Sequence, residues 1–190
     1  MWPYEGGGCP SIFDIGTGLS RTPRFAGQTK IWYPVLAHVM TVADLLPDHL
    51  KIYGLLHDAG EAVVGDQVST WKNDATSRDE DVILFRVSQM LGIEYPWGDE
   101  IWRQVKIADR MALRAEASIL GHAEPNHPSF LACEKSSIAE QRTAERCLTR
   151  ANQWTEYGYG GDLYERAVNF ALTFSDRKGG QSPVAIPPVA

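Results

Sequence analysis

The sequence predicts an all-α protein that forms a single globular helical bundle, and three observations support this. Apolar residues recur at spacings of three and four along several segments, which is typical of helices with one face in a core. No segment alternates apolar and polar residues strongly enough to build a sheet. With 190 residues, 44% apolar and 22% charged, the chain has the length and composition of one soluble domain.

The first third of the chain is expected to contain a loop followed by two helices. Residues 1–30 are rich in glycine and proline, so we expect an N-terminal segment that packs on the domain, with one short helical turn at most. Helical spacing of apolar residues predicts a first helix over 33–46, which Pro47 ends. A second apolar stretch predicts a buried helix over 49–64.

The rest of the domain is expected to be helical as well. The same periodicity predicts four more helices, over residues 78–91, 99–120, 136–151 and 162–174. The helical domain would therefore span 31–175, and the segment 176–190, which contains three prolines, would form a C-terminal tail.

The overall charge restricts the class of partner. The formal net charge of −6 and the pI near 5.3 argue against a protein that coats duplex nucleic acid, because that role needs a surplus of Lys and Arg. A small phosphate-bearing molecule remains compatible, since a bound cation and a few local basic residues can reverse the field inside a cleft.

Cysteine usage and the terminal sequence favour a reducing compartment. Cys9, Cys133 and Cys147 form neither a CxxC pair nor an even disulfide framework. Residues 1–10 lack the pattern of a secretion signal, and no run of about 18 apolar residues occurs. We therefore expect a cytoplasmic protein without a membrane segment.

Polar residues that are costly to bury stand within the most apolar helices. His57 and Asp58 follow two leucines, and burying such a pair without a partner or a metal costs several kcal/mol. Glu61 lies one turn from His57, whereas His57 and Asp58 diverge by roughly 100° on a helix, so further ligands must come from other helices. His38 and Asp109 stand in the apolar faces of two such helices.

His38, His57, Asp58 and Asp109 together form a candidate metal site. Two imidazoles and two carboxylates suit Zn, Mn, Fe, Co or Ni, and no thiolate is present to demand zinc or copper(I). Taken alone, a His in an apolar helix is more often a hydrogen-bonded core residue than a ligand. Four such residues on three predicted helices favour a shared cation, which would lower the pKa of a bound water.

At these residues the sequence resembles a known family. The segments GLLHDAGEAVVGD (54–66) and STWK (69–72) resemble the HD-domain nucleotide phosphohydrolases, especially small 5'-deoxynucleotidases and phage dATP triphosphohydrolases. The likeness runs from about residue 21 to 120 and is most specific over 57–72. It implies an HD-type helical bundle, with the four candidate ligands in the family's H…HD…D order.

The resemblance also implies roles for neighbouring residues. Glu61 would activate water or shuttle a proton, and Asp66 would act on the nucleophile or on a second cation. Lys72 matches a basic residue that meets phosphate, although without the resemblance it would be interpreted as an exposed loop lysine. Arg24 and Phe25 match an Arg–aromatic pair that precedes the first His, with the Arg on phosphate and the ring on base or sugar.

Several other residues have less specific assignments. Arg21 is a rival for the phosphate role, and Gln28 or Trp32 could touch the base instead of the aromatic ring. Ala37 stands where the family usually has a Glu, which leaves that position without a role. Glu116 fits the family's last helix and would support the site or the fold.

The implied activity is metal-dependent hydrolysis of a deoxynucleotide at the 5' phosphoester, in the host cytoplasm if the chain is phage-encoded. We favour triphosphate release from a deoxynucleoside triphosphate of the dATP type, because the glycine-rich start and short chain suit that group. Phosphate release from a deoxynucleoside monophosphate is the alternative. Mg²⁺ could accompany the phosphates, and the family's dimers and rings lead us to expect a homo-oligomer.

Two other classes of function compete with this one. A non-catalytic nucleotide-binding HD protein would keep the metal without turnover, but the presence of Glu61 and Asp66 disfavours it. A di-iron oxygenase normally needs additional His ligands, and His49, His122 and His127 lie outside the two metal-bearing helical stretches.

Overall fold

The computed structural model describes residues 10–67, 72–120, 136–156 and 160–175, and these confirm the all-α class. Within these ranges no β-strand forms, and one isolated bridge pairs Pro23 with Pro34. The predictions for 1–9, for Ser69-Thr70-Trp71 and for the tail 176–190 lie outside the described residues. The elements are α1 (Ile12–Arg21), η1 (Arg24–Gly27), α2 (Val35–Leu45), η2 (Asp48–Leu50), α3 (Lys51–Leu56), α4 (Glu61–Val64), α5 (Asp74–Met90), α6 (Asp99–Leu120), α8 (Ile138–Glu156) and α9 (Gly160–Leu172).

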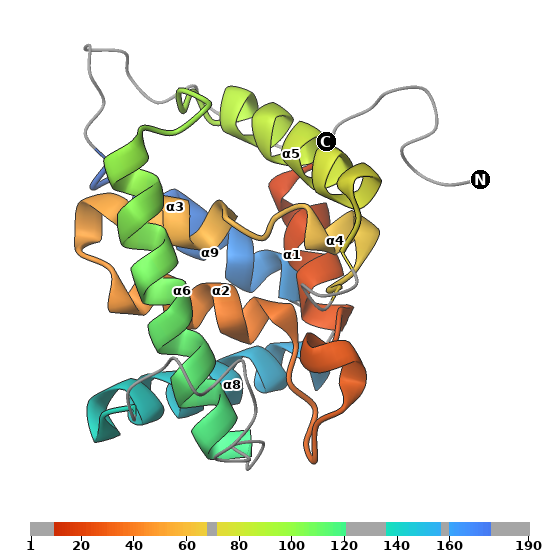
Figure 1. The fold of residues 1–190 in the computed structure, drawn as a ribbon, viewed down its shortest axis with the longest axis vertical. Coiled ribbons are helices and arrows are strands. Elements are labelled where there is room, and N and C mark those ends of the chain that lie inside the picture. The colour runs from red at the N-terminus through yellow and green to blue at the C-terminus, as the bar shows by residue number, and fades with distance from the viewer. Residues whose placement is uncertain (1–9, 68–71, 121–135, 157–159, 176–190) are drawn as a thin grey trace.

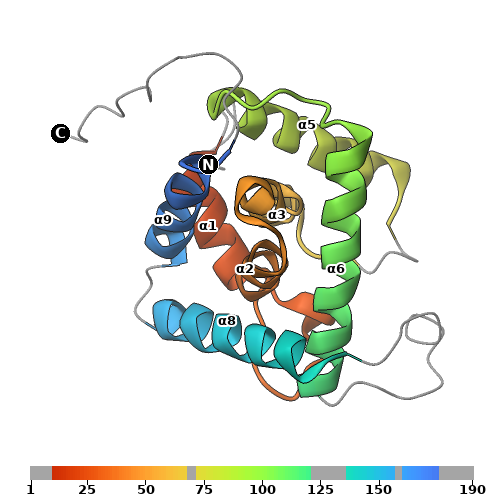
Figure 2. The same cartoon turned by 90° about the vertical axis from the view of Figure 1, so that its left-hand side faces the viewer.

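Helix α2 lies at the centre of the bundle (Figure 1) and contacts α1, α3, α6 and α8. Figure 2 shows α2 and α3 almost end-on, with α6 on one side, α1 and α9 on the other, and α5 and α8 above and below. Every residue of α2 from Val35 to Ala43 is buried. A helix that is buried all round indicates the middle of a core, so polar groups on α2 are removed from bulk water.

Residues 12–21 form a helix that the prediction of an irregular segment over 1–30 missed. Ser11 and Asp14 cap it reciprocally: Ser11 Oγ accepts from the Asp14 amide at 3.1 Å, and Asp14 Oδ2 accepts from the Ser11 amide at 3.0 Å. Gly16 faces α9 so closely that a Cβ would collide with Tyr164. Here glycine serves close helix packing rather than chain breaking, which is why the expectation was wrong.

The predicted helix over 49–64 is interrupted at the His-Asp doublet. The Ala59 amide donates to the Leu56 carbonyl at 2.8 Å, and the Glu61 amide donates to the Asp58 carbonyl at 3.0 Å. Hydrogen bonds between residues three apart make a tighter turn than an α-helix. The doublet therefore sits in a tighter turn between α3 and α4 and not within one continuous helix.

The other helices follow the prediction with shifted ends. Helix α6 has the predicted bounds, whereas α5 begins at Asp74 because the Asn73 side chain accepts from the amides of Ala75 and Thr76. Helix α8 continues beyond the predicted end to Glu156. Among the described residues no helix has both the length and the apolar character needed to cross a membrane.

Helix α5 approaches the doublet turn at Gly60. A Cβ on Gly60 would lie 2.7 Å from the Cα of Glu80 and 2.8 Å from its Cβ, well inside van der Waals contact. The absence of a side chain at this position therefore allows α5 to lie directly against the turn.

Candidate metal centre

The four predicted metal ligands lie together where α2, α3 and α6 meet. His38 is on α2, His57 follows α3, and Asp109 is on α6; one ligand atom from each lies within 4.8 Å of the others. Asp109 Oδ1 is 3.3 Å from His38 Nε2. Asp58 Oδ2 is 3.4 Å from His38 Nε2 and 3.2 Å from His57 Nε2. The group of His38, His57 and Asp109 could hold a divalent metal ion, and Asp58 is placed beside it.

Both imidazoles are fixed through the nitrogen that faces away from this point. His57 Nδ1–H donates to the Gly54 carbonyl at 2.8 Å, and His38 Nδ1 lies 2.7 Å from Glu116 Oε1. The two Nε2 atoms are buried without a hydrogen-bond partner among the described residues. They face carboxylate oxygens at 3.2–3.4 Å instead, and a metal bound at Nε2, with the other ring nitrogen hydrogen-bonded, would join these groups.

His38 and the carboxylates around it shift one another's pKa towards the charged forms. Burial and the Arg24 charge oppose protonation of His38, but Glu116, Asp109 and Asp58 outweigh them and raise its pKa well above the usual value. Burial opposes ionisation of Asp109, yet the close approach of its carboxylate to His38 lowers its pKa. The site therefore keeps ionised carboxylates and attracts positive charge to the space between them.

Glu61 begins α4, one turn after His57. Its side chain is only 5% exposed, and Oε2 has no hydrogen-bond partner within the described ranges. Burial, together with the charges of Asp58 and Asp66, raises the pKa of Glu61 to about 9. A carboxyl group in such surroundings is suited to giving and taking a proton.

Arg24 lies among carboxylates at the edge of the centre. Its guanidinium nitrogens are 3.6 Å from Glu116, 3.8 Å from Asp66 and 4.0 Å from Asp58. Asp66 Oδ2 also accepts from the Phe25 amide at 2.9 Å, and Phe25 has a left-handed φ of 55°. Non-glycine residues rarely adopt this conformation, which clusters at functional sites. Asp66 thus secures the turn η1 that carries Arg24.

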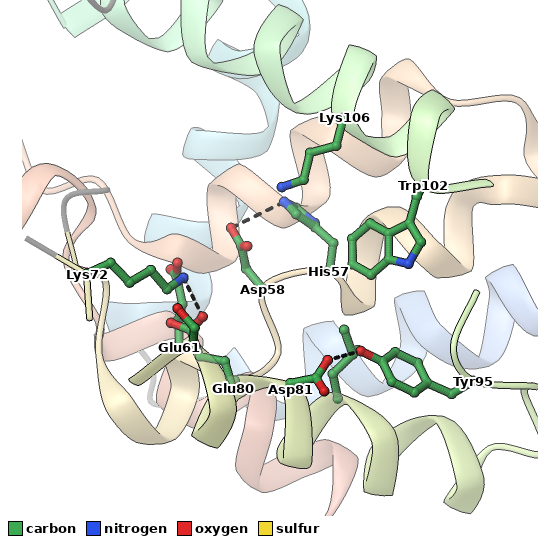
Figure 3. A pocket seen from close by; sticks show the side chains of 12 residues that line it. His57, Asp58, Glu61, Lys72, Glu80, Asp81, Tyr95, Trp102 and Lys106 are labelled. Atoms are coloured by element: carbon green, nitrogen blue, oxygen red, sulfur yellow. Dashed lines mark hydrogen bonds and ion pairs between the residues drawn. The ribbon is translucent and has the colours of Figure 1, made fainter. Parts of the chain in front are cut away.

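A cavity of about 200 Å³ adjoins the centre and is bounded by the doublet turn, α5 and α6 (Figure 3). Lys72 pairs with Glu80 beside it, and the Tyr95 hydroxyl donates to Asp81. Lys106, on α6, also lines the cavity, and its Nζ lies 3.6 Å from Asp109 Oδ2. The lining residues are His57, Asp58, Gly60, Glu61, Lys72, Ser77, Glu80, Asp81, Leu84, Tyr95, Trp102 and Lys106.

The structure brings most of the predicted site residues to the centre or the cavity, but not three of them. Arg21, Gln28 and Trp32 have exposed side chains and do not line this cavity. Phe25 lies half-buried, with the Arg24 guanidinium 5.4 Å from the centre of its ring. The contacts with base or phosphate expected for these residues stay predictions.

The sequence interpretation missed much of the cavity wall. Trp102 and Lys106 precede Asp109 by seven and three residues on α6, a spacing that places all three on one helix face and could have indicated them. Glu80 and Asp81 lie among many charged residues of α5, and no local pattern distinguishes them.

Comparison with known proteins identifies a relative of unknown activity. No protein-family model matches the chain. Over 113 residues, the chain is 29% identical to an uncharacterized protein of Escherichia coli (strain K12), YfdR. The matched part covers 58% of this chain and spans 61% of the length of that protein. The name of this relative states no activity.

Proposed function

We propose that the chain is a metal-dependent phosphohydrolase that cleaves deoxynucleotides at the 5' phosphoester, with a deoxynucleoside triphosphate of the dATP type as substrate. The observation that carries this proposal is the pair of buried Nε2 atoms, without hydrogen-bond partners among the described residues, that face two carboxylates beside a cavity. The order of these residues in the chain also underlies the family resemblance.

His38, His57, Asp58 and Asp109 would hold the cation. Their mixed nitrogen and oxygen donors suit Co, Mn, Zn, Fe or Ni. When bound, such a cation polarises a phosphate oxygen and makes water a better nucleophile near neutral pH.

The reaction consumes one water molecule. A bond forms between the water oxygen and the α-phosphorus, and the bond between that phosphorus and the 5' oxygen breaks. One water proton ends on the 5' oxygen of the nucleoside, and triphosphate leaves. Glu61 is suited to moving this proton, because its carboxyl group is buried beside the ligands and has an oxygen without a hydrogen-bond partner in the described ranges.

The basic residues around the cavity support a polyanionic substrate. Lys72, just before α5, and Lys106, on α6, line the cavity, and the Arg24 guanidinium lies 4.0 Å from Asp58. Lysine provides a mobile charge for phosphate, and arginine provides a planar donor. A triphosphate, with Mg²⁺ on the phosphates, would exchange the ion pairs that these lysines form with Glu80 and Asp109 for contacts with phosphate oxygens.

Product chromatography tests this proposal directly. Deoxynucleoside mono- and triphosphates would be incubated with the protein and Co²⁺ or Mn²⁺. We expect nucleoside and triphosphate from a triphosphate, and loss of both products in His57→Ala and Asp109→Ala. His49→Ala is the matched control, because His49 is exposed on η2.

Three outcomes would count against the proposal. Full rates in the two ligand variants would place the chemistry elsewhere. Release of phosphate from monophosphates alone would favour the deoxynucleotidase alternative. Binding of nucleotides without turnover under every metal would favour a non-catalytic nucleotide-binding protein.

A further inference from the structure

Glu116 is a fully buried carboxylate that contacts His38 and Arg24, with Tyr33 nearby. It lies on α6, seven residues after Asp109, and its exposed fraction is 0%. One oxygen, Oε1, is 2.7 Å from His38 Nδ1, and the other, Oε2, is 3.6 Å from an Arg24 nitrogen. Burying a charge costs several kcal/mol unless it is paired, so a carboxylate at this depth needs both contacts.

The contact between Glu116 Oε1 and His38 Nδ1 determines the orientation of the His38 ring. Glu116 Oε1 lies 2.7 Å from Nδ1, and a ring that binds a cation through Nε2 keeps its proton on this other nitrogen. His38 Nδ1 therefore carries the proton that is donated to Glu116. The ring then directs Nε2 towards Asp58 and Asp109, which are 3.4 Å and 3.3 Å away.

The second contact determines where Arg24 lies. Of the three carboxylates that form ion pairs with the guanidinium, Glu116 is the nearest, ahead of Asp66 and Asp58. Arg24 is attached to the turn η1, whose backbone Asp66 holds through Phe25. Because Arg24 Nε has no hydrogen-bond partner among the described residues, the guanidinium is oriented largely by its charge contacts.

We propose that Glu116 is a positioning residue with two separable tasks: one oxygen orients His38 for the cation, and the other holds Arg24 at the edge of the site for an anionic ligand. The second task rests on the proposed phosphohydrolase function, because it assumes that Arg24 meets phosphate. The first task rests on the contacts of His38 and does not depend on any reaction.

Glu116→Gln separates the two tasks. Its amide oxygen can still accept from His38, but the neutral amide no longer holds the Arg24 charge. We expect the variant to keep the Nδ1 proton of His38 in the zinc-loaded protein, seen as a slowly exchanging signal in nitrogen–proton correlation spectra. Inorganic phosphate should bind the metal-loaded variant about tenfold more weakly, which is the scale for a lost charged contact.

Glu116→Ala removes both contacts. Loss of an outer hydrogen-bond partner of a metal-binding His typically costs about 10–100-fold in metal affinity, and we expect that loss for Co²⁺ in this variant, together with loss of the His38 Nδ1 signal. Glu100→Gln, an exposed change on the same helix, is the control and should alter neither reading. If Glu116→Ala does not fold, the Gln variant carries the test alone.

A double-mutant cycle tests the link with Arg24. Combined with Arg24→Gln, Glu116→Gln should weaken phosphate binding no further than Arg24→Gln alone, because both changes remove the same contact. Equal losses of Co²⁺ and phosphate affinity in Glu116→Gln would show that the two tasks of Glu116 cannot be separated. Wild-type values for both would show that Glu116 does not hold Arg24 for an anionic ligand. None of these readings involves turnover, so they stay informative even if no nucleotide is hydrolysed.

Discussion

The candidate metal centre and the outer end of the cavity, which is the part lined by Lys72 and Tyr95, are both built from titratable residues, yet these are held in different ways. At the centre, His38 and Glu116 are fully buried, and they pair with each other across two helices. At the outer end, Lys72 and Tyr95 are half-buried and pair with carboxylates of α5. The deep groups are arranged before any ligand arrives, whereas the outer pairs can be exchanged for contacts with a ligand.

This difference has an energetic cause. A buried carboxylate or imidazole that loses its partner remains unpaired in a low-dielectric interior, which is costly. A solvent-accessible ion pair contributes about 0–1 kcal/mol, since water can replace either partner. Substitutions at the centre should therefore affect both stability and metal binding, and those at the outer end should mainly affect ligand binding.

The largest effect on stability is expected for His38→Ala. It removes a ligand and leaves Glu116 without its nearest partner, so the metal-free protein should lose about 3 kcal/mol, near the low end for breaking a buried charged pair. His57→Ala should lose less, because His57 Nδ1 contacts a backbone carbonyl. Thermal unfolding with a chelator measures both losses. Equal losses in the two variants would show that pairing His38 with a buried carboxylate adds no more stability than pairing His57 with a backbone carbonyl.

Glu61→Gln is expected to reduce the hydrolysis rate by about 100–10,000-fold, the usual range for a lost proton-transfer group. Stability should change with pH as well. Folding raises the pKa of Glu61 from 4.5 to about 9, so its stabilising contribution is complete below pH 4.5 and is lost as the pH rises towards 9. The neutral variant should therefore gain stability relative to the wild type across this range.

Chemical unfolding of the metal-free protein at several pH values checks the second part of this prediction. Glu100→Gln, which replaces an exposed carboxylate, is the control and should show no such trend. A difference between Glu61→Gln and the wild type that stays constant from pH 4.5 to about 9, the window set by the two pKa values, would contradict it.

Lys72→Ala should act on ligand binding and not on the metal. We expect the KM for a triphosphate to rise about tenfold, the scale of one charged contact, with Co²⁺ affinity unchanged. Steady-state kinetics and metal titration separate these two quantities. Lys30→Ala, at an exposed position away from the cavity, is the control. A loss of Co²⁺ affinity in Lys72→Ala would show that the outer end of the cavity also contributes to metal binding.

The smallest effect is expected for Tyr95→Phe. The change removes the hydrogen bond to Asp81 at the outer end and should cost about 0.5–1.5 kcal/mol, the range for one hydrogen bond. Denaturant unfolding measures this cost. A loss as large as that of His38→Ala would show that the outer pairs are as structural as the deep ones.

The sequence predicted those features of the fold and the site that a pattern within one segment encodes. The bounds of α6 follow from its apolar periodicity, and the placement of His38 and Asp109 within apolar helices predicted their convergence with the doublet. The helix at 12–21 was missed because its glycines were interpreted as chain breakers, although Ser11 and Asp14 have the spacing of a cap.

Other contacts in the site carried no such signal. The pairing of Lys72 with Glu80 depends on how the residues just before α5 turn back along that helix. The approach of Arg24 to Glu116 joins residues far apart in the chain through a turn with left-handed backbone. Neither periodicity nor spacing encodes such contacts, because they arise only when the helices are packed.

Gly60 limits which substitutions the wall of the cavity can tolerate. Since even a methyl group there would strike Glu80 on α5, the width of the cavity depends on a position that contributes no atom to chemistry. A larger residue would require either α5 or the doublet turn to move, because the Cα and Cβ of Glu80 occupy the space beside Gly60. A single substitution at Gly60 could thus change the shape of the cavity or the placement of His57 and Asp58 without replacing any candidate metal ligand.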